Sequence, residues 1–124
     1  MKLCVFQGTF NPIHNAHINM ALYILNRYQA DNIMFIPAYL PPHKTINEKM
    51  SIHRFNMVKL AVEKYQKFLV SDIEYQQDRI SYTYLTILDL YFFFSLLNVI
   101  KEKKKYPEKE KSTQSFRYCK NFVR

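Results

Sequence analysis

The chain has 124 residues and a formal net charge of +8. That length allows one domain with a hydrophobic core and excludes a large multidomain protein. Residues 1–95 carry nine Lys or Arg against seven Asp or Glu, and residues 96–124 carry nine against three. We therefore expect a domain over residues 1–100 and a basic, solvated or disordered tail over residues 101–124, with an acidic partner as the alternative role of the tail. The small charge excess of the folded part gives no indication of nucleic-acid binding.

The cysteines and the first apolar run bear on the cellular compartment. Cys4 and Cys119 are far apart and lack metal or redox spacing, which favours free thiols in a reducing environment. The apolar run after Lys2 is interrupted at Gln7 and Gly8, before a secretory signal is complete. We therefore expect a cytoplasmic protein.

The first half of the chain predicts a strand, a helix and a second strand. Residues 3–6 are a short apolar run typical of a buried strand, and residues 33–36 are another, ended by Pro37. Between them a helix of about 14 residues, which Asn15 can cap, is indicated by apolar spacings of three and four. The apolar positions of this helix are Ile18, Ala21, Leu22, Leu25 and Tyr28. Such a unit makes the two strands parallel neighbours, so the expected fold class is α/β.

The later segments predict two more helices and a third strand. Ser51 can cap a helix that runs to about residue 67. Its expected buried side consists of Ile52, Phe55, Val58, Ala61, Val62 and Tyr65. Residues 68–74 read as a strand, and Ser81 or Thr83 can cap a helix that runs to residue 100. Asp89 and the short apolar run after it argue against a membrane span.

The segment after the first strand, residues 7–17, has the sequence QGTFNPIHNAH. It lies at the carboxyl end of that strand, where open α/β sheets bind ligands. Free amides at the helix start favour an anion, and Gly8 lets the backbone approach it closely. His14 and His17 project to the same side of the helix start. Lys44 follows the second strand and can face the histidines, so this set suits several phosphate oxygens.

Phosphoryl and nucleotidyl transfer need positioning and stabilisation of moving negative charge, and they require no protein nucleophile. No serine or cysteine of this chain stands in a recognisable nucleophile context. Two other interpretations stay open at this point. The two histidines are exposed loop residues, or they bind zinc with His43 and His53, although no cysteine or carboxylate completes that set.

Three ordered segments carry a resemblance to a known family. Residues 8–17, GTFNPIHNAH, resemble the (H/T)xGH signature of the HxGH nucleotidyltransferase superfamily. Residues 41–44, PPHK, and residues 80–83, ISYT, are similar to bacterial-type nicotinate mononucleotide adenylyltransferase. The resemblance covers roughly residues 1–88. It implies a Rossmann-like sheet and adenylyl transfer from ATP to nicotinate mononucleotide, which gives deamido-NAD and pyrophosphate in NAD biosynthesis.

The resemblance also implies catalytic and ATP-binding roles. His14 and His17 would bind the ATP phosphates and stabilise charge as pyrophosphate leaves. Lys44 would add positive charge to the phosphate region as a third catalytic residue. The backbone contacts to the nucleotide would come from Gly8, Thr9 and Phe10.

Substrate binding is the other role that the resemblance implies. The residues expected around nicotinate mononucleotide are Asn11, Lys44, Ser81, Tyr82 and Thr83. Magnesium would arrive with ATP, so no dedicated protein metal site is expected.

The chain also departs from the family. Gln7, Asn11 and Ala16 stand where glycine, aspartate and glycine are usual. No later segment resembles the family's Gly-x-Asp turn or its ISxTxxR motif, so we expect a sheet that is incomplete at the C-terminus. The runs FFF at residues 92–94 and KKK at residues 103–105 prompt the hypothesis of a coding slip. Other reading frames of the downstream DNA that lack both motifs would refute it.

Other functions stay open beside the adenylyltransferase. One is a truncated, catalytically inactive nucleotide-binding domain. Another is a related nucleotidyltransferase with a different phosphate substrate, and a third is a basic nucleic-acid binder that depends on the tail alone. An unpaired sheet edge and an uncovered apolar helix over residues 85–100 also predict self-association or a homo-oligomer.

Overall fold

The structure, a computed structural model, describes residues 1–43, 47–104 and 122–123. In chain order its elements are β1 (Leu3–Gly8), α1 (Asn15–Arg27), β2 (Asn32–Pro37), α2 (Glu48–Val62), β3 (Phe68–Ser71), the 3-10 helix η1 (Ile73–Gln76), α3 (Thr83–Lys104) and β4 (Phe122–Val123).

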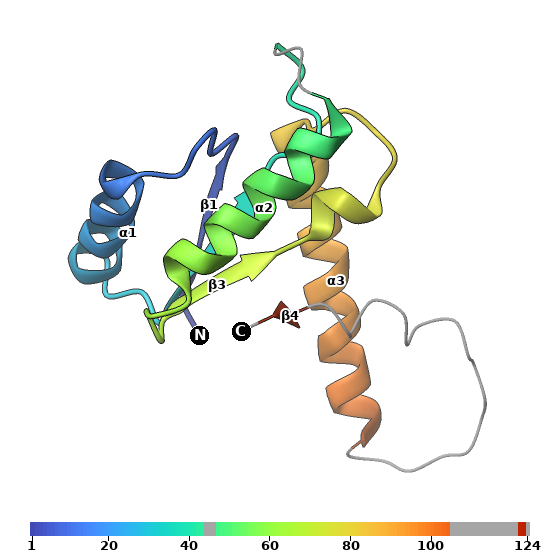
Figure 1. Cartoon of the computed structure of the whole chain (residues 1–124). Coiled ribbons are helices and arrows are strands. Elements are labelled where there is room, and N and C mark those ends of the chain that lie inside the picture. Colours follow the sequence, from blue (N-terminus) through green and yellow to red (C-terminus); the bar gives the residue numbers. More distant parts are fainter. Residues whose placement is uncertain (44–46, 105–121, 124) are drawn as a thin grey trace.

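The strands form a four-stranded sheet in the order β1-β2-β3-β4. β1 and β2 are parallel, with Cys4 opposite Ile33 and Gly8 opposite Pro37. β2 and β3 are also parallel, whereas β4 is antiparallel to β3. The predicted parallel strand-helix-strand unit and the Rossmann-like α/β class are therefore confirmed, and the segment after β1 lies at the carboxyl edge of the sheet (Figure 1).

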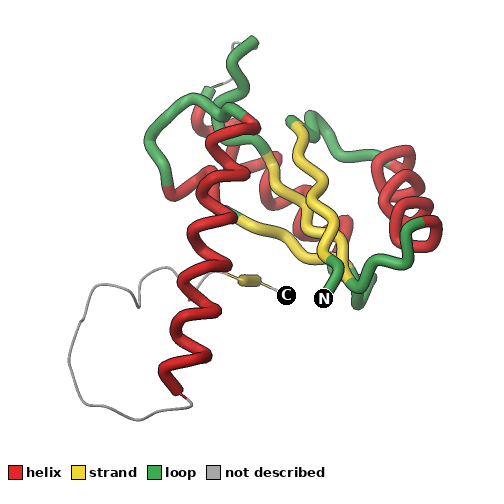
Figure 2. The backbone as a smooth tube through the Cα atoms, turned by 180° about the vertical axis from the view of Figure 1, so that it is seen from behind, coloured by secondary structure: helices red, strands yellow, loops and turns green. Residues whose placement is uncertain are grey.

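Helices cover the two faces of the sheet unequally. α1 and α2 pack on one face against Ile33 and Phe35 of β2. α3 crosses the other face (Figure 2). There Leu90 packs against Met34 and Ile36. Because successive residues of a strand point to opposite faces, β2 is buried on both sides. β2 is therefore the centre of the three layers.

The structure corrects two of the expected strands. β1 was expected to be buried, but its residues are mostly half-buried, and Val5 is 44% exposed because β1 forms an edge of the sheet. The third strand was expected over residues 68–74, but β3 ends at Ser71 and the chain turns into η1. That turn buries the Glu74 carboxylate among polar partners that a continued strand would not reach.

The N-cap of the first helix lies one residue before the predicted cap, Asn15. His14 is the N-cap of α1 and Asn15 is the first helical residue. The buried residues of α1 are Ile18 and Ala21, whereas Tyr28 lies beyond the helix and is 59% exposed.

The second helix was placed too late by the sequence pattern. Asn47 caps α2, with its side chain accepting from the Lys49 N–H at 2.9 Å. Ser51 is therefore not a cap but a buried residue one turn inside the helix. α2 ends at Val62. Its predicted buried side is confirmed apart from one residue, because Ile52 is 57% exposed while the others belong to or pack against the core, namely Phe55, Val58, Ala61, Val62 and Tyr65.

The third helix begins after Tyr82, whose carbonyl accepts from the N–H groups of Leu85 and Thr86 at 3.0 and 3.2 Å. The Ser81 side chain bonds elsewhere, so it is not the cap, and Thr83 is already helical. The helix continues to Lys104, so the first four residues of the expected tail over residues 101–124 are helical, and residues 122–123 form β4. The other residues of that tail, among them Cys119, lie outside the described residues. None of the helices in the described part combines the length and apolarity needed to cross a bilayer.

Candidate functional site

A hollow of about 700 Å³ lies at the carboxyl ends of β1 and β2. Three segments that are far apart in the sequence line it. They are the end of β1 with Gly8 and Thr9, the loop after β2 with His43, and the start of α3 with Tyr82 and Thr83. Each of the three motifs singled out in the sequence therefore contributes residues to one cavity.

Hydrogen bonds hold these three segments together. The Ala38 N–H donates to the Gly8 carbonyl at 2.8 Å, which extends the pairing of β1 and β2. The Ser81 N–H donates to the Leu40 carbonyl at 2.8 Å, and the Ser81 Oγ accepts from the Leu40 N–H at 3.0 Å. The side chain expected to touch substrate thus fixes the loop after β2 to the start of α3.

Gly8 provides space for a neighbouring ring. A Cβ at Gly8 would lie 3.1 Å from the Phe10 ring, closer than ordinary van der Waals contact. That ring is 2% exposed and packs edge-on against Phe6 at a centroid distance of 5.6 Å. Phe10 itself has φ 45, a conformation that non-glycine residues rarely adopt. The single glycine therefore lets the loop fold tightly over the end of β1.

The two histidines form a stacked pair at the start of α1. Their ring centroids are 3.8 Å apart, with 33° between the planes. The His17 Nδ1 accepts from the His14 N–H at 3.1 Å, so the neutral His17 ring carries its proton on Nε2. Burial lowers the pKa of His17 below its usual 6.5, and the neighbouring His14 lowers it further by a smaller amount. At neutral pH His17 is therefore a neutral donor through Nε2.

The histidine pair lies beside the hollow without lining it. Thr9 lines the hollow, and the next residue, Phe10, meets the His17 ring edge-on at 5.1 Å. Asn11 is exposed in the turn that follows. Lys44 lies outside the described residues, so its expected position facing the histidines stays a prediction.

Arg54 is the most prominent polar residue near the site that the sequence interpretation missed. Its side chain is 0% exposed, and its Nη1 donates to the carbonyls of Thr9 and Ala38 at 2.6 and 2.8 Å. Its Nη2 donates to the Tyr39 carbonyl at 3.0 Å and to the Ser51 Oγ at 2.9 Å. The available signal was its position in the helix, because residues 51, 54, 58 and 62 share one buried face.

A buried carboxylate is the second feature that was missed. Glu74 is 6% exposed and accepts from the Thr86 Oγ1 at 2.6 Å and from the Tyr39 N–H at 3.1 Å. The Gln7 side-chain amide also donates to it. The glutamine that stands where the resemblance led us to expect glycine therefore connects β1 with η1. No sequence motif marked this contact, because its members lie far apart in the chain.

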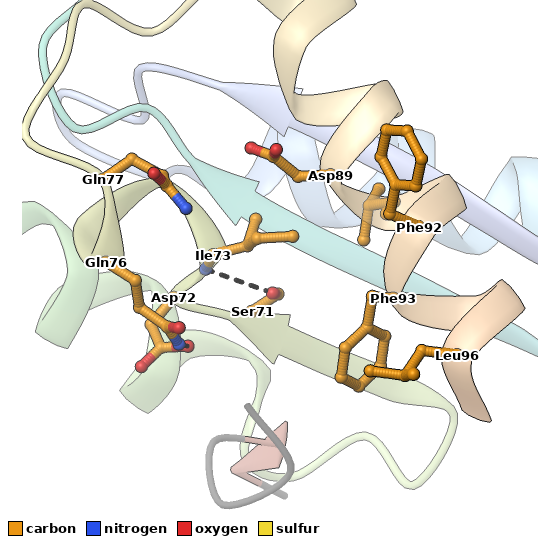
Figure 3. A pocket seen from close by; sticks show the side chains of 10 residues that line it. Ser71, Asp72, Ile73, Gln76, Gln77, Asp89, Phe92, Phe93 and Leu96 are labelled. Carbon is orange, nitrogen blue, oxygen red and sulfur yellow. Dashed lines mark hydrogen bonds between the residues drawn. The ribbon is translucent and has the colours of Figure 1, made fainter. Parts of the chain in front are cut away.

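A second hollow of about 210 Å³ lies between η1 and α3 (Figure 3). Its apolar wall includes Phe92, Phe93 and Leu96, and its polar side includes Asp72 and Gln76. None of the predicted site residues borders it. We therefore assign it to the loose packing of α3 rather than to the candidate site.

The four histidines do not form a metal site. Among the residues that the structure describes, no three His, Cys, Asp or Glu side chains converge in a way that could hold an ion. His14 and His17 stack on each other, whereas His43 lines the hollow from another loop. The zinc interpretation therefore has no geometric support.

The three parallel strands β1, β2 and β3, with helices on both faces, define a Rossmann-like α/β domain. The hollow lies at the carboxyl ends of its strands, where such domains bind ligands. Residues 5–113 match the cytidylyltransferase-like family. Because that match spans most of the chain, the protein belongs to this family.

Curated relatives support the assignment. A protein named probable nicotinate-nucleotide adenylyltransferase from Clostridium botulinum (strain Okra / Type B1) is 49% identical over 84 residues, which cover 67% of this chain and 42% of the relative. A protein of the same name from Clostridium tetani (strain Massachusetts / E88) is 46% identical, covering 73% of this chain and 50% of the relative. The chain thus spans about half the length of the curated relatives it matches, or less.

Proposed function

We propose that this chain transfers the adenylyl group of ATP to nicotinate mononucleotide, giving deamido-NAD and pyrophosphate. The observation that carries the proposal is the meeting of three motif segments around one hollow beside a histidine pair. The names of the relatives from two clostridial species support a nicotinate nucleotide as acceptor and an adenylyl group as the group transferred. A cytoplasmic location fits this function, because both substrates are small phosphorylated metabolites.

In the proposed reaction a phosphate oxygen of the mononucleotide attacks the α-phosphorus of ATP. The bond between the α-phosphorus and the bridging oxygen breaks, and pyrophosphate takes the electron pair. His17 would donate from Nε2 to a phosphate oxygen, as its bond from the His14 N–H leaves that nitrogen protonated. His14, exposed beside it, would share this role. Both would favour the transition state by stabilising charge that moves toward the leaving group.

The other predicted residues fit binding roles. Gly8, Thr9 and Phe10 would offer backbone groups to the nucleotide, and Ser81, Tyr82 and Thr83 would lie near the mononucleotide together with Asn11 and Lys44. Magnesium would be carried by the triphosphate, whose oxygens are its preferred ligands. The described residues offer hydroxyls, imidazoles and amides here rather than converging carboxylates, which suits an ion that arrives with ATP.

A second candidate is a nucleotide-binding domain without catalysis. The observation that favours it is the length of the relatives, because 42% to 50% coverage leaves at least half of each relative without a counterpart here. Such a domain would bind ATP in the same hollow but would not catalyse adenylyl transfer.

One assay separates the two candidates. The protein is incubated with ATP, magnesium and either nicotinate or nicotinamide mononucleotide, and pyrophosphate release is followed. Release that depends on nicotinate mononucleotide supports adenylyl transfer. ATP binding seen by calorimetry without pyrophosphate release supports the inactive domain. Pyrophosphate release from ATP and magnesium when no mononucleotide is added points to a different acceptor.

A further inference from the structure

Arg54 is a buried cation whose partners are neutral. Arginine is almost never fully buried unless it is paired, yet each of the four hydrogen bonds from Arg54 ends on a carbonyl or a hydroxyl. The salt bridge found among the described residues joins Arg79 and Asp89 instead. The charge of Arg54 is therefore not cancelled by a carboxylate in direct contact.

The carbonyls that Arg54 binds belong to the two loops at the carboxyl edge of the sheet. Thr9 directly follows β1, and Ala38 and Tyr39 directly follow β2. A planar guanidinium holds its donors in a fixed fork, so one side chain sets the distance between both loops. Thr9 and Ala38 also line the hollow, and the guanidinium therefore lies one hydrogen bond behind its wall.

This arrangement decides which backbone groups face a ligand. Because Arg54 is buried, the Thr9 carbonyl that it binds points into the protein. In a trans peptide the C=O and the following N–H point in opposite directions, so the Phe10 N–H points away from Arg54. A carbonyl oxygen would repel a phosphate, whereas an N–H attracts it.

Building on the proposed function, we propose that Arg54 is a positioning residue of the nucleotide site. It draws the carbonyls of Thr9 and Tyr39 inward, so that the loops offer the Phe10 N–H and a positive potential to the phosphates of ATP. The buried Glu74 carboxylate interacts electrostatically with Arg54 without contacting it, so the fixed geometry of the guanidinium matters more here than its charge.

Contacts around Arg54 keep its fork in place. The Ser51 Oγ donates to the Tyr39 carbonyl at 2.6 Å, and the Tyr75 hydroxyl donates to the Ser51 carbonyl at 2.8 Å. The Tyr75 ring also packs on Tyr39 at a centroid distance of 5.1 Å. Burial raises the pKa of the Tyr75 hydroxyl to about 12, so it stays a neutral donor. The start of α2, the loop after β2 and η1 thus form one support.

Two variants of Arg54 and one matched control test this role. Arg54→Lys keeps the charge, but a single ammonium cannot hold the carbonyls of both loops, and Arg54→Met removes charge and fork together. Val62→Ala removes buried apolar atoms at the far end of the same helix. ATP affinity in magnesium is measured by calorimetry below the unfolding temperature of each variant.

We expect ATP to bind about tenfold more weakly to Arg54→Lys and more weakly still to Arg54→Met, with Val62→Ala within about twofold of the parent protein. Wild-type affinity in folded Arg54→Lys would overturn the inference. So would an equal loss in Val62→Ala, because the effect would then follow stability alone.

If the Arg54 variants do not fold, the role of Arg54 can be tested by a measurement on the unmodified protein. In a titration of ¹⁵N-labelled protein with ATP and magnesium, the Phe10 amide should be among those that shift most. A stationary Phe10 amide at saturation contradicts the inference, whereas absent pyrophosphate release with normal ATP binding contradicts only adenylyl transfer. A protein that binds no ATP overturns both.

Discussion

The two faces of the sheet differ in how far they are closed. On the face of α1 and α2, a continuous cluster of buried residues extends from Phe10 through Ile33 and Phe35 to Val58 and Val70. On the face of α3, the buried cluster consists of Met34, Ile36 and Leu90. Within the part of the chain that the structure describes, one face carries an extended core and the other is covered by α3 alone.

The exposed side of α3 shows the same difference from outside. Large apolar side chains along this helix are exposed, namely Tyr84, Ile87, Leu88, Tyr91, Phe92 and Leu96. Folded domains seldom leave such a row uncovered. Among the residues that the structure describes, the face of α1 and α2 is therefore closed, whereas the side of α3 that points away from the sheet is left uncovered.

Deleting core atoms should cost most on the closed face. Phe35→Ala removes a fully buried ring that contacts Phe6, Phe10 and Phe68 and should lower the free energy of unfolding by about 3–5 kcal/mol. Leu90→Ala on the open face should cost about 2 kcal/mol. Urea unfolding followed by circular dichroism measures both. A larger loss for Leu90→Ala would reverse the comparison.

Filling the space at Gly8 tests the tight loop above the closed face. Gly8→Ala places a Cβ 3.1 Å from the buried Phe10 ring and should destabilise the protein by about 1–3 kcal/mol. ATP affinity should fall as well, because the ring and the loop must shift. Ala16→Ser, at an exposed position of α1, is the control. Unchanged stability in Gly8→Ala would show that the loop and the Phe10 ring can shift without a cost in free energy.

Charging the open face should change association and leave folding intact. We expect the protein to self-associate through α3, and Phe92→Glu, at a side chain 66% exposed, should shift it toward monomer. Its free energy of unfolding should stay within about 0.5 kcal/mol of the parent value. Tyr23→Glu, 60% exposed on α1, is the control. Sedimentation velocity that shows the same association in both variants would contradict this role of α3.

The smallest expected effect is a pH dependence from His17. Its pKa in the folded protein is below 6.5, so the unfolded chain binds the proton more readily. The stability tied to this group is complete above pH 6.5 and decreases as the pH falls toward the folded pKa. His17→Asn should flatten this part of the stability curve. Equal slopes in His17→Asn and the parent protein would exclude His17 as the cause.

The spacing of apolar residues and the rule for strand crossovers correctly predicted the features that depend on nearby residues in the chain. The parallel unit of β1, α1 and β2 and the position of the histidine segment follow from apolar spacing and the crossover rule. The pairing of His14 with His17 follows from their spacing of three on a helix start. These features depend on neighbours in the chain, which a single sequence displays.

Features that depend on distant partners could not be predicted in this way. No pattern in the sequence assigned a role to Arg54, because arginine is usually exposed and its burial depends on the distant carbonyls of Thr9, Ala38 and Tyr39. Ser51 looked like a helix cap because serine favours that position, yet Asn47 takes it and frees Ser51 to support the Arg54 fork. The end of β3 likewise depends on the buried partners of Glu74.

The central claim is that the histidine pair beside the hollow carries out adenylyl transfer. The most direct measurement is deamido-NAD formation from ATP and nicotinate mononucleotide, followed by chromatography for the parent protein, His17→Asn and the exposed control His53→Asn. We predict product from the parent and from His53→Asn, and a loss of at least about 100-fold in His17→Asn with ATP affinity less affected. Equal product from His17→Asn, or none from the folded parent protein, would contradict the claim.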